Sequence, residues 1–359
     1  MQYDSSPERS SFFPTSDFAE CRLHLGKNKK ILVFLSVCTT SDFAECRLHL
    51  GKTKKILVFL SVCTTFAGSM KEKYNYKVAG HVFAVCNNTE DNIAQWLDHY
   101  KPFLIDTNDD ETPVFTLNVK DRVEEEGFVQ EIHQDDDGSE ISAGHLNNGS
   151  PCFRFLLRHE QVATMITDRE YHSAELGMTS CQQFGLDNAL MVMYALATAT
   201  LQTALFHSSV IGYKGHGYMF LGKSGTGKST HSCLWLRYIE GTELMNDDNP
   251  VVRITNGEAR VYGSPWSGKT PCYRNIDNPL GAIVLLSQAP WNRIERLIKL
   301  QAYAAIVPSI SGKRWDQRIA EGLHETENWL AGHTAVYHLE CLPNEAAAQL
   351  CRETVATHP

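Results

Sequence analysis

The sequence contains one stretch that fits the pattern G-x-x-x-x-G-K-[ST]: Gly222-Lys223-Ser224-Gly225-Thr226-Gly227-Lys228-Ser229-Thr230. Glycines in this pattern let the backbone turn tightly and point its N–H groups at an anion, and the helix that follows adds its positive end. The Lys228 ammonium can reach β- and γ-phosphates, and the Ser229 hydroxyl can bind Mg²⁺. The stretch therefore predicts a nucleotide phosphate site that residues 222–230 form together.

The residues on either side of this loop support that interpretation. Residues 217–221 are an apolar run typical of a buried strand, and residues 231–238 can wind as a helix. Strand, glycine-rich turn and helix is the context that the motif requires. A surface turn rich in glycine and serine is the alternative, and this context disfavours it.

The composition is that of a globular protein of about two domains. Apolar residues make up 43% of the chain and charged residues 21%. The net charge of −9 argues against a nucleic-acid partner. The sequence contains no run of eighteen apolar residues, so it predicts no membrane-spanning helix. The eleven cysteines form no C-x-x-C pair, as in a reduced cytoplasmic protein.

Residues 15–39 and 40–64 are nearly identical copies that differ at Asn28 and Thr53. A two-copy repeat with so little divergence is typical of a recent duplication rather than of a repeat fold. We expect residues 1–69 to be an extension outside the fold, although each copy could form a strand. A secretory leader is the alternative, because an apolar run over residues 56–63 follows two lysines.

Residues 70–185 predict a smaller β-rich α+β region. Between its expected strands lies an acidic stretch that ends in Asp135-Asp136-Asp137-Gly138, which favours a solvated hairpin edge with a D-G turn over a metal site. The expected strands cover residues 76–85, 113–119 and 151–158, and a short helix capped by Asp91 covers residues 91–100.

Residues 186–359 predict an α/β domain with a mixed sheet. A helix over residues 187–205 is apolar nearly all round, so we expect it to be buried. The turn Asn256-Gly257 predicts a hairpin within a sheet that also contains parallel strands. Further strands are expected over 280–286 and 334–339, and further helices over 314–330 and 344–355.

The second chemical element is Asp247-Asp248, at the end of a strand-like segment after the loop. Adjacent carboxylates on a strand point to opposite sides, so one can bind Mg²⁺ while the other faces an acceptor hydroxyl as general base. A turn before Asn249-Pro250 is the alternative interpretation.

Taken together, residues 207–269 resemble the C-terminal domain of HPr serine kinase/phosphorylase and its HPr-kinase-like relatives. That superfamily shares a P-loop fold with phosphoenolpyruvate carboxykinase. The resemblance rests on the loop itself, on a histidine before it and an Asp-Asp pair after it, and on the element Pro265-Trp266-Ser267-Gly268-Lys269.

The resemblance implies a role for each matching residue. Lys228 would neutralise the β- and γ-phosphates, Ser229 and Asp247 would hold Mg²⁺, and Asp248 would be the base. His207 would lie near the transferred phosphate or tune the base; a histidine at a helix C-terminus is the alternative. Lys269 would reach phosphate or an acidic substrate, and a simple hairpin-loop lysine is the alternative.

The expected function is an ATP-dependent kinase that uses Mg²⁺ to phosphorylate a hydroxyl group of a protein serine or a small molecule. True HPr kinases carry an acidic residue where Thr230 stands, and their E-x-R-G signature is not found here, so HPr itself is not the expected acceptor. A nucleotide-sensing module and an ATP-dependent carboxykinase are the alternatives. The acceptor, a reverse phosphorolysis and a homo-oligomer stay open.

Overall fold

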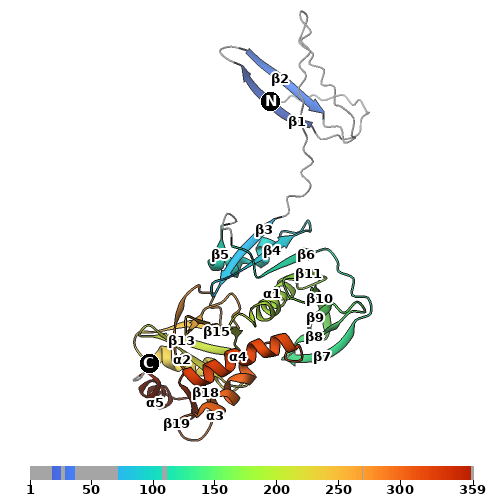
Figure 1. Ribbon diagram of the computed structural model, residues 1–359. Coiled ribbons are helices and arrows are strands. Elements are labelled where there is room, and N and C mark those ends of the chain that lie inside the picture. Colours follow the sequence, from blue (N-terminus) through green and yellow to red (C-terminus); the bar gives the residue numbers. More distant parts are fainter. Residues whose placement is uncertain (1–17, 26–28, 37–71, 107–110, 269, 357–359) are drawn as a thin grey trace, which may run out of the picture. The chain divides into compact units, whose positions relative to one another are not determined.

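The structure, a computed structural model, describes residues 18–25, 29–36, 72–106, 111–268 and 270–356. Internal contacts divide the chain into two units, Met1–Gly68 and Ser69–Pro359. In the first unit, β1 (Phe18–Leu25) and β2 (Lys29–Ser36) pair as an antiparallel hairpin within the first copy of the repeat (Figure 1). The second copy lies outside the described residues.

The second unit begins with a mixed sheet. Its described strands are β3 (Lys73–Val78), β4 (His81–Asn87), β5 (Leu104–Ile105), β6 (Phe115–Lys120), β7 (Val129–Asp136), β8 (Ser139–His145), β9 (Pro151–Leu157), β10 (Glu160–Thr167) and β11 (Ser173–Met178). They lie in the order β5-β3-β4-β6-β11-β10-β9-β8-β7. The β4–β6 and β6–β11 pairs are parallel and the others antiparallel.

Two predictions for this region are wrong. Residues 76–85 are not one strand, because Ala79 and Gly80 take φ values of +47° and +77° and turn the chain between β3 and β4. Residues 91–100 do not form one helix but part of two 3₁₀ turns, Ile93–Trp96 and Asp98–Phe103. The Asn92 side chain caps the first turn by accepting from the Ala94 N–H at 3.2 Å.

The predicted acidic hairpin is confirmed. Strand β7 is largely exposed, and Asp137 and Gly138 turn into β8 with φ values of +55° and +83°. The Asp135 carboxylate accepts from the Gly138 N–H at 2.9 Å, which is the usual way an aspartate stabilises a tight turn.

The second sheet is also mixed, so the predicted α/β class is confirmed at that level. Its described strands are β12 (Thr203–Leu205), β13 (Ser208–Tyr213), β14 (His216–Leu221), β15 (Thr242–Asp248), β16 (Val251–Thr255), β17 (Glu258–Tyr262), β18 (Asp277–Gln288), β19 (Arg293–Arg296) and β20 (Val336–Cys341). The main order is β12-β16-β17-β18-β14-β13-β15, and β20 joins β18 to β19. Strand β18 runs parallel to β14 and β20.

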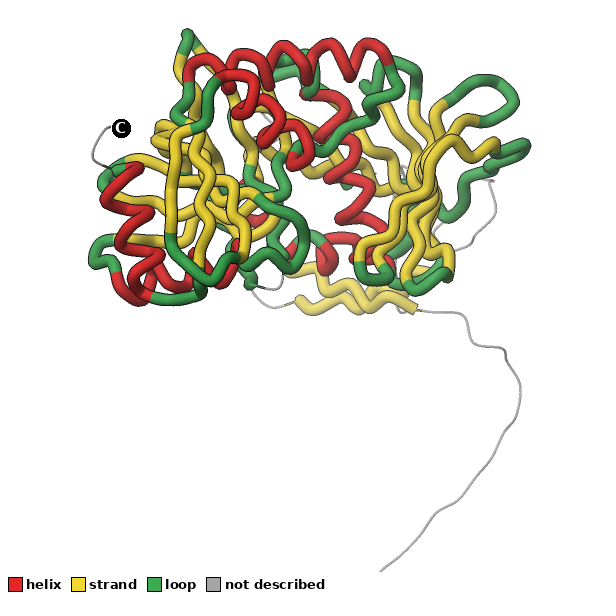
Figure 2. The backbone as a smooth tube through the Cα atoms, turned by 90° about the horizontal axis from the view of Figure 1, so that it is seen from below, coloured by secondary structure: helices red, strands yellow, loops and turns green. Residues whose placement is uncertain are grey.

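Helices lie on both faces of this second sheet (Figures 1 and 2). One face packs into a core shared with α1 (Gln182–Thr198), α3 (Lys299–Ile306) and α4 (Gln317–His333). The other packs into a core that includes Trp235 of α2 (Lys228–Tyr238) and Cys351 of α5 (Glu345–Val355). Within the part of the chain that the structure describes, no helix is long and apolar enough to cross a membrane.

Helix α1 is buried, as its apolar sequence predicts, and it contacts β10 and β11 of the first sheet and β12 of the second. Figure 2 shows it between two groups of strands. Its predicted end at residue 205 is wrong: the helix ends at Thr198, whose carbonyl accepts from the Leu201 N–H at 2.9 Å. Residues Thr203–Leu205 pair with β16 instead, because strand pairing outweighs their helix propensity.

We expect deletion of residues 1–69 to leave the melting temperature and the nucleotide affinity nearly unchanged. Ser69–Pro359 forms a compact unit with its own two sheets and cores, and the loop of residues 222–230 lies wholly within it. Thermal melting and nucleotide titration of the shortened and full chains check this. A large loss of either property would show that the repeat stabilises the second unit.

Candidate active site

The phosphate-loop motif occupies the predicted strand-to-helix connection, between the end of β14 and the start of α2. Gly222 and Gly227 take φ values of +151° and +101°, which other residues rarely adopt. A Cβ at Gly222 would lie 2.4 Å from Thr226 Oγ1, so the turn has no room for a side chain there. Lys223, Ser224, Gly225, Ser229 and Thr230 are exposed along this loop and helix start.

Lys228 lies half-buried beneath the loop and donates to the Gly222 carbonyl at 3.0 Å. Burial lowers the pKa of its ammonium, and the negative charges of Asp248, Asp136 and Asp247 oppose that shift. The loop lysine and the predicted acidic pair therefore lie close enough to interact electrostatically. The contribution of Asp136, from the distant strand β7, has no signal in the sequence near the loop.

Asp247 and Asp248 end strand β15 opposite Ser209 and Ser208 of β13. Asp247 shares its face with Ser209, whose hydroxyl contacts the Ser232 hydroxyl of α2 at 2.6 Å. Asp247 thus lies on the face of the sheet that α2 covers, and α2 is the helix that contains Ser229. Asp247 is only 6% exposed. This placement separates the two carboxylates, as their adjacency predicts.

The Asp248 carboxylate is held from two sides. His207 Nδ1 lies 3.1 Å from one carboxylate oxygen, and the Asn249 side-chain amide donates to the other at 2.8 Å. Asp248 also has a φ of +153°, and strain of this kind costs of order 1–3 kcal/mol and clusters at functional sites. The alternative interpretation of His207 as a helix C-terminal residue is wrong, because α1 ends at Thr198 and the His207 N–H donates to the Ser309 carbonyl at 2.7 Å.

A second loop, described over residues 264–268, contacts the acidic pair. Ser267 pairs with Asp248 as an isolated β-bridge, and the Gly268 N–H donates to the Asp247 carbonyl at 2.8 Å. The Asn246 amide donates to Ser264 Oγ at 3.1 Å and fixes this loop against β15. Asn246 and Ser264 are supporting residues that sequence reasoning missed. Lys269 lies outside the described residues.

We expect Gly268→Ala to reduce turnover by about tenfold without weakening nucleotide binding. A Cβ at this position would lie 3.1 Å from Asp248 Cβ and 3.2 Å from the Asp247 carbonyl oxygen, so the acidic pair would have to move. Gly332→Ala is the matched control, since its Cβ would meet Lys299 at an ordinary 3.6 Å. Steady-state kinetics of both variants check the prediction, and an unaltered turnover in Gly268→Ala would contradict it.

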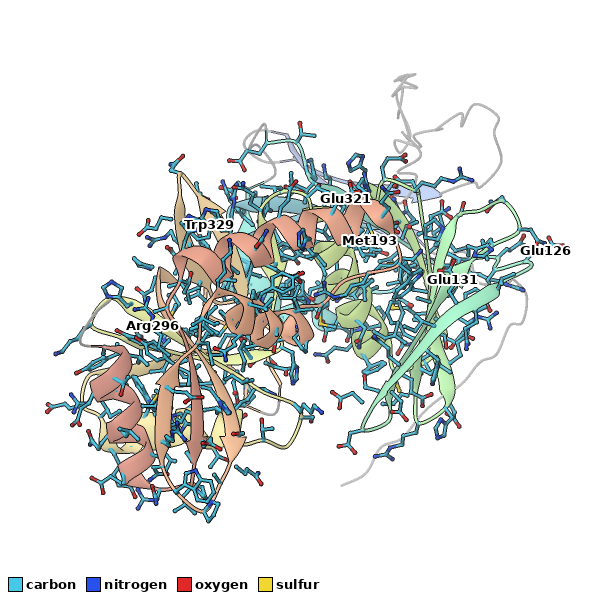
Figure 3. All side chains as sticks on the ribbon, turned by 60° about the horizontal axis from the view of Figure 1, so that its bottom comes forward. Glu126, Glu131, Met193, Arg296, Glu321 and Trp329 are labelled. Carbon is cyan, nitrogen blue, oxygen red and sulfur yellow. The ribbon has the colours of Figure 1, made fainter. Side chains whose placement is uncertain are left out.

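A cavity of about 1170 Å³ adjoins Asp248 and His207. Its other walls come from β7–β9, α1 and the segment of residues 307–315, while the residues of the phosphate loop do not line it. Glu131 and Met193, labelled in Figure 3, mark β7 and α1. Glu131 accepts from the Trp315 indole and lies 3.5 Å from Lys313, which links β7 to the 307–315 segment.

The residues present fit a magnesium ion bound together with a nucleotide. Among the described residues, no group of three or more His, Cys, Asp or Glu side chains could hold a metal by itself. Mg²⁺ usually binds through one or two carboxylates plus substrate phosphates, which suits the Ser229 hydroxyl and the Asp247 carboxylate beside the loop.

No protein-family model matches the sequence, and a search of curated proteins finds no match. Among solved structures, the chain is similar to the Hpr(Ser) kinase/phosphatase from Coxiella burnetii, at 12% identity and with a TM-score of 0.25. The match covers 43% of this chain and 95% of that chain. At this TM-score, the similarity assigns no role to any residue here.

Proposed function

We propose that this chain is an ATP-dependent kinase of the HPr-kinase-like group that transfers the γ-phosphate to a hydroxyl group. The observation that carries the proposal is the position of Asp248. Its charge acts on the loop lysine Lys228, and its carboxylate lines the adjoining cavity. A carboxylate between a phosphate site and a separate cavity is where a base must be for transfer between two substrates.

In this proposal the nucleotide phosphates lie on the loop of residues 222–230, with their charge balanced by backbone N–H groups and Lys228. Lys228 leaves the Gly222 carbonyl to meet the β- and γ-phosphates. Ser229 and Asp247 would hold Mg²⁺, which would add to the neutralisation of the phosphate charge when bound.

The oxygen of the acceptor hydroxyl then bonds to the γ-phosphorus while the bond from that phosphorus to the ADP oxygen breaks. Asp248 receives the proton that the hydroxyl loses. His207 and Asn249 orient the carboxylate through contacts at 3.1 and 2.8 Å, so little reorganisation is needed at transfer. The proposed kinase function implies the P-loop fold of the phosphoenolpyruvate carboxykinase group. An enzyme that uses ATP would work in the cytoplasm.

A transfer assay tests the proposal. The full chain is incubated with Mg²⁺ and ATP labelled at the γ-phosphate, together with protein and small-molecule fractions of a lysate. We expect label to appear in one fraction. Tight ATP binding without any transfer would favour the nucleotide-sensing module instead.

A further inference from the structure

The cavity beside Asp248 is where the acceptor must lie if the proposed kinase function holds, and the inference below rests on that function. A hydroxyl group has to approach the Asp248 carboxylate from a space that the nucleotide does not fill. The cavity meets this requirement because it is lined by Asp248 but not by residues of the phosphate loop. The side chains that line the cavity therefore indicate which chemical groups the acceptor carries.

The charge of the cavity wall is negative. Among the described residues, its two permanent cations are Lys313 and Arg314, and both already have carboxylate partners that are not part of the lining. Lys313 lies 3.5 Å from Glu131, and Arg314 lies 2.6 Å from Glu327, which is fully buried. Of the wall's aspartates, Asp136 and Asp248 act on the Lys228 ammonium of the phosphate loop, whereas Asp135 and Asp187 have no lysine or arginine partner in the described part of the chain.

Asp187 is the least exposed of these acids, with 28% of its side chain exposed against 33% for Asp248. It lies in the second turn of α1, its carboxylate is 2.9 Å from His99 Nε2, and the Tyr100 hydroxyl interacts with it electrostatically. Neither partner is a lysine or an arginine. Burial raises the pKa of the Asp187 carboxyl, an effect that its histidine and tyrosine partners only oppose. A bound cation would stabilise the charged carboxylate at this position.

Aromatic side chains surround this end of the cavity. Tyr273 packs on His99 with ring centroids 5.0 Å apart, and Trp266 and Phe184 also line the wall. Aromatic faces beside a carboxylate are a favourable environment for an alkylammonium group, through cation–π attraction and apolar contact. The same faces offer nothing specific to a carboxylate or phosphate group.

Asp187 and Asp248 are linked through a short chain of contacts. Ser267 bridges Asp248, and the indole of the preceding Trp266 donates to the Tyr100 hydroxyl at 2.9 Å. The Tyr100 hydroxyl in turn interacts electrostatically with the Asp187 carboxylate. Both carboxylates line the same cavity, so a molecule that spans the cavity can contact both.

We propose that the phosphate acceptor is an amino alcohol, an organic molecule that carries a protonated amine as well as the hydroxyl group. Its ammonium binds at Asp187 between the aromatic side chains, and its hydroxyl group faces Asp248. Asp187 is then a specificity-determining residue for the proposed reaction and not a base.

Isothermal titration calorimetry on the full chain without nucleotide tests this. Three probes share a phenyl group and a hydroxyl: phenylalaninol is a cation at neutral pH, phenylpropanol is neutral and phenyllactate is an anion. We expect phenylalaninol to bind about tenfold or more tightly than either of the others. Asp187→Asn should abolish that preference, whereas Asp277→Asn, at an exposed ion pair with Arg260, should keep it.

Equal or tighter binding of phenyllactate would overturn the inference, and so would saturable binding of none of the probes up to about 10 mM. An amine preference that survives Asp187→Asn would overturn it as well. The ranking of the probes on the unaltered chain is decisive by itself if the variant fails to fold. Label transfer to an amine-free acceptor would overturn the amine site alone, whereas amine binding without any transfer would overturn only the kinase.

Discussion

Asp248→Asn is expected to lower the turnover of the proposed kinase by about a hundredfold or more while leaving ATP affinity nearly unchanged. An amide has the size of a carboxylate and can keep contacts with His207 and Asn249, which lie 3.1 and 2.8 Å from the present oxygens. It cannot take up the proton of the acceptor hydroxyl. The loss should therefore fall on turnover and not on nucleotide binding.

Steady-state kinetics and nucleotide titration of the Asp248→Asn variant separate these two quantities. Asp98→Asn is the control, because Asp98 is exposed and pairs with Lys101 on the surface. A variant that turned over normally would remove Asp248 from the role of base. Equal losses of turnover and affinity would instead indicate that Asp248 holds the nucleotide or its metal.

The second large effect is expected for Lys228→Ala, which should abolish measurable ATP binding. The Lys228 ammonium is the half-buried cation of the loop, and at that position its attraction to phosphate is less screened than at the surface. Without it, the negative charges of Asp136, Asp247 and Asp248 would face the phosphates with only the exposed Lys223 left as a cation of the loop. Repulsion would then add to the lost attraction.

Nucleotide titration by calorimetry measures this loss directly. Lys214→Ala is the control, since Lys214 is an exposed residue of the turn between β13 and β14. Thermal melting shows whether the Lys228→Ala variant remains folded. ATP affinity within a few-fold of the original would mean that the motif does not form the nucleotide site.

The sequence predicts the parts of this site that depend on neighbouring residues. At the glycine positions of 222–227, another residue would lack either space or an allowed backbone conformation, so the local sequence is enough to predict the turn. Asn256-Gly257 likewise forms the predicted hairpin turn, with φ values of +53° and +77°. Asp247 and Asp248 end the expected strand, and the structure brings them to the loop.

The parts that the sequence could not predict depend on contacts between distant segments. Asp136 acts on Lys228 from another sheet, and Asp187 meets His99 across 88 residues of sequence. Periodicity carries no information about such pairs. The predicted end of α1 is wrong for a related reason. Pairing of β12 with β16 stops a helix that local propensity would continue.

Phosphorus NMR of the full chain with Mg²⁺, ATP and the acceptor-containing fraction tests the proposed phosphoryl transfer most directly. Transfer to a hydroxyl predicts a new phosphomonoester resonance that grows in step with ADP and disappears in the Asp248→Asn variant. An ATP spectrum that stays unchanged while the nucleotide binds, or one that yields ADP with inorganic phosphate alone, would contradict the assignment of this chain as a kinase.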